Sequence, residues 1–138
     1  MKNNSTVAVA QFGSVFGDKQ ACVEKAISIV ETAHKHKVQF VLFPEAFISG
    51  YPRGLSFGVT IGKRQPEGRE LFAKYFDSSI EVPGPEIDLL CQAANGNQVG
   101  LCIGVVERGT AGDRRTLYCT LVFIDEKKQD NAVHMKTN

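Results

Sequence analysis

A strand–helix–strand pattern in the first 43 residues restricts the fold of this chain more than any other feature. Thr6–Phe12 is short, rich in valine and followed by Gly13, which predicts a strand. Val38–Phe43 is apolar almost throughout, which favours a strand buried on both faces. Pro44 ends that strand because proline cannot donate to a sheet ladder. A strand, a helix and a second strand in this order predict an α/β layer architecture.

The segment between these two strands has the pattern of an amphipathic helix. Asp18 is a suitable N-cap, and the helix is expected to end near His36. Apolar residues recur at helical spacing on one face, while lysines and glutamates occupy the opposite face. The apolar residues are Cys22, Ala26, Ile29, Val30 and Ala33.

The rest of the chain is expected to continue as one domain without a repeat or linker. A glycine- and proline-rich loop is expected over 44–68, followed by a short helix over 69–76 and a rigid turn over 82–85. A second helix is expected over 86–94, with its stop at Gly96. Strands over 99–107 and 116–124 are expected to pair as a hairpin, and a polar turn is expected over 125–131. This order again favours an α/β fold.

The composition excludes several classes of protein. A net charge of +1, with 22% charged and 43% hydrophobic residues, leaves no basic excess of the kind that nucleic-acid-binding domains carry. No apolar run approaches the ~20 residues of a membrane-spanning helix. Residues 1–5 are polar, are expected to be flexible, and lack the apolar core of a signal peptide. We therefore expect a cytoplasmic protein that binds neither nucleic acid nor membranes.

The four cysteines do not have the spacing of a metal site. None belongs to a C-x-x-C pair, and the three histidines do not cluster near them. A disulfide framework is not expected without a secretory signal. Each cysteine lies in an apolar stretch, so we expect four buried free thiols. They are Cys22, Cys91, Cys102 and Cys119.

Glu45 is the first candidate for chemistry because it lies just past the end of a predicted buried strand. Ligands bind at that edge of open α/β sheets. Partial desolvation there would raise the pKa of a carboxyl group toward the range that is useful for proton transfer. The alternative is a loop glutamate that caps the next helix or faces water.

A longer string around Glu45 resembles the glutamate motif of the nitrilase branch of the carbon–nitrogen hydrolase superfamily. The string is Phe43–Gly54, and Val7–Gln11 looks like the first strand of the family. Further landmarks similar to those of the family follow in the same order at 68–70, 82–86 and 117–120. The resemblance covers about residues 6–125, and we expect residues 6–138 to form part of one nitrilase domain.

This resemblance implies a fold and a reaction. The fold is the nitrilase-type α-β-β-α sandwich, of which this chain would form roughly the first half. The reaction converts a nitrile to a carboxylic acid and ammonia through a Cys–Glu–Lys triad, in which a thiolate attacks the nitrile carbon and forms a thioimidate. The string looks closest to true nitrilases, including plant-type enzymes acting on cyanoalanine. It implies Glu45 as general acid/base, no metal or organic cofactor, and a homo-oligomeric complete protein.

The tail of the chain offers a counterpart of the family's lysine. Aligned from Asp125 without a gap, His134 and Lys136 fall on the histidine and the catalytic lysine of the family, and Met135 stands where arginine is usual. The resemblance therefore implies that Lys136 stabilises charge in the tetrahedral species. The alternative is an ordinary surface lysine in a frayed tail.

The nucleophile of the triad is absent from this sequence. The family's cysteine lies in a Cys-Trp-Glu string downstream of the lysine, and the chain contains no tryptophan. Cys119 and Cys102 lie in apolar strands, where burial raises the pKa of a thiol and makes it a poor nucleophile. We therefore expect neither to replace it. Tyr51 and Glu107 are candidates for the substrate pocket, each with a purely structural role as the alternative.

Two other functions stay open at this stage. An amidase of the same superfamily is the runner-up to a nitrilase. The chain also fits a truncated, non-catalytic module that binds a partner or does nothing. The sequence that follows Asn138 in the transcript separates an enzyme from a non-catalytic module, because the enzyme requires a downstream Cys-Trp-Glu string.

Overall fold

The protein is described by a computed structural model that covers residues 4–57, 59–60, 63–64, 66–110, 112, 116–127 and 132–137. For 59–60, 63–64 and 132–137 it describes the backbone alone. Of the segment expected to be flexible, residues 1–3 lie outside this range. Most of the turn expected over 125–131 is also outside, although residues 126–127 do form a turn.

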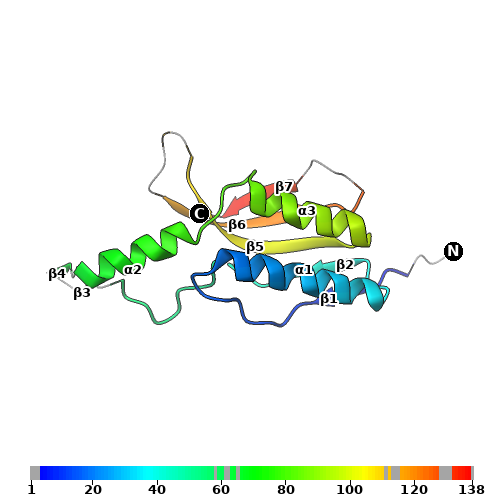
Figure 1. Cartoon of the computed structure of the whole chain (residues 1–138), viewed down its shortest axis with the longest axis horizontal. Coiled ribbons are helices and arrows are strands. Elements are labelled where there is room, and N and C mark those ends of the chain that lie inside the picture. The colour runs from blue at the N-terminus through cyan, green and yellow to red at the C-terminus, as the bar shows by residue number, and fades with distance from the viewer. Residues whose placement is uncertain are drawn as a thin grey trace.

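A five-stranded mixed sheet forms the centre of the molecule (Figure 1). Its strand order is β1-β2-β5-β6-β7, with β1, β2 and β5 parallel and β5, β6 and β7 antiparallel. The hairpin expected between the two long strands is confirmed as β5 and β6. The strands are β1 (Val7–Val9), β2 (Phe40–Leu42), β5 (Gly100–Arg108), β6 (Leu117–Ile124) and β7 (Ala132–Thr137).

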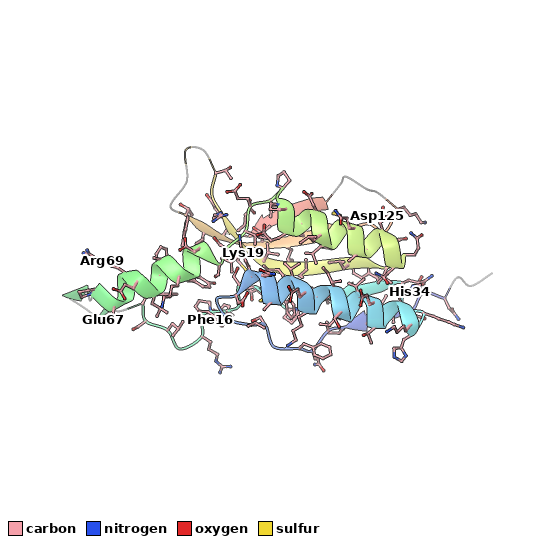
Figure 2. The ribbon with its side chains drawn as sticks, in the orientation of Figure 1. Phe16, Lys19, His34, Glu67, Arg69 and Asp125 are labelled. Carbon is pink, nitrogen blue, oxygen red and sulfur yellow. The ribbon has the colours of Figure 1, made fainter. Side chains whose placement is uncertain are left out.

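Two helices cover one face of this sheet, which is the α/β layering that the sequence predicts (Figure 1). They are α1 (Lys19–Lys35) and α3 (Pro85–Asn97). The predicted N-cap is confirmed, because the Asp18 carboxylate accepts a hydrogen bond of 2.9 Å from the amide of Ala21. A salt bridge of 2.6 Å between Lys19 Nζ and Glu86 Oε1 links the first turns of the two helices. Figure 2 labels Lys19 at the start of α1.

Neither α1 nor α3 covers the opposite face of the sheet, which exposes apolar side chains. The register aligns Val9, Leu42, Cys102 and Phe123 across four strands. Of these, Val9, Leu42 and Phe123 are 66%, 44% and 40% exposed. The expectation that Val38–Phe43 is buried on both faces is therefore wrong for this chain, because α1 and α3 cover only one side. We call this surface the helix-free face.

The long loop expected over 44–68 contains more structure than the sequence predicts. Two short strands pair in it, β3 (Val59–Thr60) and β4 (Lys63–Arg64), and α2 (Pro66–Asp77) begins three residues before the expected start. Proline suits the first turn of a helix because no intrahelical partner exists for its missing N–H. Figure 1 shows α2 extending away from the sheet, with β3 and β4 at its far end.

Other predicted boundaries shift by a few residues. The first strand is limited to Val7–Val9 instead of running to Phe12. The expected stop at Gly96 is wrong, since α3 continues to Asn97 and ends at Gln98, which adopts a left-handed φ of 55°. The tail is not frayed in its described part, because β7 pairs with β6.

Candidate active site

Glu45 lies in a bulge that interrupts the pairing between β2 and β5. The amide of Gly104 donates to Pro44 O at 3.2 Å, and the amide of Ile48 then donates to Gly104 O at 3.1 Å. Residues 45–47 therefore leave the ladder between two hydrogen bonds to the same glycine. Ala46 has a φ of 48°, which a residue with a side chain adopts only where its surroundings enforce it. The bulge places Glu45 above the helix-free face.

Gly104 is the residue on which this bulge rests. A Cβ at position 104 would lie 2.5 Å from Ala46 N, 2.5 Å from Pro44 O and 2.6 Å from Glu45 Cα. All three atoms belong to the backbone, so no side-chain rotation would relieve the contact. A glycine within a strand marks such a close backbone approach. The missing side chain of Gly104 therefore fixes how closely Glu45 approaches the sheet.

Tyr75 of α2 supports the far side of the glutamate loop. Its hydroxyl donates to Gly50 O at 3.1 Å, and its ring stacks on Phe16 with 5.5 Å between centroids. Figure 2 labels Phe16 in the segment that leads into α1. Burial raises the pKa of Tyr75 to about 12, and the neighbouring Cys119 and Tyr51 add to the rise. Tyr75 thus stays neutral and keeps its donor over the physiological range of pH.

Glu45 opens into a small pocket of about 210 Å³. Its carboxylate accepts a hydrogen bond of 3.1 Å from the thiol of Cys119 on β6. The lining residues are Glu45, Ala46, Tyr51, Pro52, Tyr75, Val106, Leu117, Tyr118 and Cys119. A titratable carboxylate beside an apolar and aromatic wall is suited to holding a small, weakly polar substrate and moving protons to it.

Two expectations about this pocket are wrong. Glu45 is exposed, whereas its place at a strand end predicted partial burial. Cys119 is only half-buried and faces the carboxylate, whereas Cys22, Cys91 and Cys102 are buried as expected. Both differences arise on the helix-free face, which α1 and α3 do not cover and where Tyr75 of α2 packs on Val106.

The two predicted pocket residues lie in different places. Tyr51 lines the pocket and is 63% exposed. Glu107 does not line it and is 3% exposed, and the Thr120 hydroxyl donates to its Oε2 at 2.7 Å. Side chains alternate along a strand, so Thr120 and Cys119 lie on opposite faces of β6. The structure therefore brings Tyr51 to Glu45 and leaves Glu107 on the helix-covered side.

Lys136 belongs to β7, and its Cα pairs with that of Thr120. By this register Lys136 shares its face of the sheet with Thr120, while Cys119 pairs with Thr137. The side chain of Lys136 lies outside the described part of the structure. The structure consequently fixes which strand carries this lysine, two strands away from the bulge.

Sequence reasoning missed the roles of Gly104, Tyr75 and Cys119. Gly104 carried a usable signal, because glycine is unusual inside an otherwise apolar strand. Tyr75 carried no signal, since its partner Gly50 lies 25 residues away in a loop. Cys119 carried a misleading one, because the apolar residues beside it suggested full burial.

Other regions of the described chain show no second centre. No group of three potential metal ligands occurs among the residues that the structure covers. None of the helices described is long and apolar enough to cross a membrane. A larger hollow of about 470 Å³ lies between β1 and α1, and it contains none of the predicted site residues.

Comparison with known proteins gives one family. Residues 6–138 match the carbon–nitrogen hydrolase family. A bifunctional nitrilase/nitrile hydratase of Nicotiana tabacum is 44% identical over 97% of this chain, and Nitrilase 3 of Arabidopsis thaliana is 41% identical over 94%. The chain spans only 38% and 36% of the length of these two relatives.

Solved structures agree on the fold. A carbon–nitrogen hydrolase superfamily protein of Xanthomonas campestris superposes with a TM-score of 0.63 at 12% identity, over 94% of this chain and 39% of that one. An amidase of Nesterenkonia sp. gives 0.62 at 14% identity, over 99% of this chain and 44% of that one. The sheet and its helix layer therefore correspond to part of the fold of this superfamily.

Proposed function

Because this chain belongs to the carbon–nitrogen hydrolase family, we propose that it is the glutamate-bearing part of a nitrilase. The complete protein would convert R–C≡N and two waters to a carboxylic acid and ammonia. The observation that carries the proposal is Glu45, which stands in a strained bulge at the mouth of a pocket, within a chain 44% identical to a nitrilase/nitrile hydratase.

Glu45 would act as the general acid/base. It would take the proton of the attacking thiol, pass protons to the nitrile nitrogen, and then activate the water that hydrolyses the thioimidate. Its exposed carboxylate in a 210 Å³ pocket has room for a substrate and a water molecule. The cysteine nucleophile would come from a part of the complete protein outside these 138 residues.

Lys136 would stabilise the negative charge that develops in the tetrahedral species. The spacing from Asp125 supports this role. The register of β7 bears on it as well, because it pairs Lys136 with Thr120 rather than with Cys119. The pocket contains Cys119, whereas the register places Lys136 beside Thr120. The role therefore requires the long lysine side chain to reach the pocket from this neighbouring position or around the end of the sheet.

The rest of the proposal concerns the complete protein. Tyr51 would contact the substrate, since it lines the pocket beside Glu45. For the complete protein we further propose a cytoplasmic location, and homo-oligomeric assembly as the family resemblance implies. The tobacco relative is named as both a nitrilase and a nitrile hydratase, so the released product is expected to include amide as well as acid.

The test is to extend the chain with the C-terminal part of a nitrilase relative that supplies the cysteine. Glu45→Gln keeps the shape of the side chain and removes its titrating group. We expect kcat to fall by at least ~10²–10⁴-fold, measured as ammonia release from nitriles. Hydrolysis of amides but not of nitriles by the extended protein would favour the amidase function instead.

Lysine variants of the same extended protein test the tail. Lys136→Met keeps the apolar stem and removes the charge, and we expect a large fall in kcat. Lys127→Met is the matched control, because its side chain is 79% exposed and lies 4.0 Å from the carboxylate of Glu126. Full activity in Lys136→Met would show that the gapless alignment of the tail is wrong, and it would leave the role of Glu45 intact.

A further inference from the structure

Cys119 differs from the other three cysteines of this chain. Cys22, Cys91 and Cys102 are 0%, 8% and 2% exposed and pack as small apolar residues. Cys119 is half-buried and directs its sulfur at the Glu45 carboxylate, 3.1 Å from Oε1. The two residues are 74 positions apart in the sequence. Only the sheet brings them together, so the contact is a tertiary feature.

The arrangement of strands explains why the thiol meets the carboxylate. Cys119 pairs with Val106 across β5 and β6. Val106 packs against Ala46, the neighbour of Glu45 in the bulge. The thiol therefore stands on the same face of the sheet as the bulge and just beyond Val106. An S–H group donates to an anionic oxygen, whereas a carboxylate has no proton to give.

The backbone of Glu45 is fixed, but its side chain needs a second point of support. Gly104 and its two hydrogen bonds hold the bulge. The carboxylate lies three rotatable bonds further on and is exposed, so rotamer freedom opposes any single orientation. A donor at one carboxylate oxygen selects one orientation and leaves the other oxygen available for proton transfer.

We propose that Cys119 is a positioning residue for Glu45, whose thiol holds Oε1 so that Oε2 faces the substrate. This inference rests on the proposed role of Glu45 as general acid/base. It assigns to Cys119 no covalent bond with the substrate. A thiol that donates its proton to an anion is held in its protonated form, and the protonated form is the weaker nucleophile.

The hydrogen bond itself is tested in the 138-residue chain by alkylation with iodoacetamide at neutral pH, followed by mass mapping. Replacing Glu45 with glutamine removes the anion that holds the proton, so Cys119 is expected to react at least about threefold faster. Glu70→Gln, which changes an exposed glutamate of α2, is the matched control and should leave the rate unchanged. An unchanged Cys119 rate in Glu45→Gln would overturn the inference.

The consequence for catalysis is tested in the extended protein. Cys119→Ala removes the donor and is expected to lower kcat at least about tenfold with little change in KM, which corresponds to one hydrogen bond to a charged group. Cys119→Ser restores a donor and should recover most of the loss, whereas a packing defect would not be rescued in this way. Wild-type kcat in Cys119→Ala, or a nitrile adduct on Cys119, would overturn the inference.

The Glu45→Gln variant separates this inference from the proposed function. If Glu45→Gln is inactive while Cys119→Ala is fully active, the general acid/base stands and only the positioning role fails. If Glu45→Gln keeps full activity, the proposed function itself fails, whatever the alkylation rates show.

Discussion

Gly104→Ala is the sharpest perturbation of the site that substitutes none of its functional side chains. The added Cβ would meet three backbone atoms of residues 44–46 at 2.5–2.6 Å. To reach an ordinary van der Waals contact, the bulge must retreat by roughly 1 Å, and a misplacement of that size costs on the order of 10²-fold in rate. The retreat also weakens two hydrogen bonds at Gly104, so we expect a stability loss of about 1–3 kcal/mol.

Gly100→Ala is the matched control because it adds the same methyl group to the same strand. Its Cβ would meet Phe40 Cδ2 at 3.0 Å and Glu126 Oε2 at 3.1 Å, and both belong to side chains that can move. Ammonia release and urea denaturation of the extended protein would be compared for the two variants. Equal kcat and equal unfolding midpoints in the two variants would refute the claim that the close contact between Gly104 and the bulge fixes the position of Glu45.

Three further predictions concern the chain itself. The 138-residue chain alone should release no ammonia from nitriles, and turnover that Glu45→Gln abolishes would contradict this. The chain should self-associate through its helix-free face, so light scattering should show smaller species for Phe123→Lys (40% exposed) but not for Leu89→Lys on α3 (46% exposed). The free energy of unfolding should fall as pH rises from about 10 to about 12. Folded Tyr75 holds its proton up to a pKa of about 12, whereas the unfolded tyrosine, with its ordinary pKa of 10.0, loses the proton earlier. Tyr75→Phe should reduce this fall, and Tyr51→Phe should reduce it far less, because Tyr51 makes the smallest of the three contributions to the raised pKa of Tyr75.

Local signals in the sequence were sufficient for the helix layer. Asp18 and the apolar spacing after it predict both the start and the buried face of α1, because capping and amphipathicity depend on residues within a few positions of each other. The failure at Gly96 is also local, since Gln98 takes the left-handed position that glycine usually fills. Helices were therefore predictable to within a few residues.

Burial of the sheet was not predictable from the same signals. The apolar run that contains Leu42 predicts a strand in a sheet, but it does not show whether a second layer of the protein covers each face of that sheet. Leu42 is 44% exposed because α1 and α3 pack on the other side of the sheet. The contact between Glu45 and Cys119 is hidden for a related reason, since it depends on the register of β5 against β6 and not on any local pattern.

The residues that support Glu45 are separate from the side of the site at which a nucleophile would approach. Glu45 is held by elements that this chain contains in full, namely the bulge on Gly104, the Tyr75 contact to its loop, and the thiol of Cys119. What is open is the side from which a nucleophile would approach, over the helix-free face. A general acid/base works best when its orientation is fixed before the substrate arrives. Residues outside this chain would then need to bring a cysteine to a carboxylate that is already in place, and would not have to build the carboxylate's support as well.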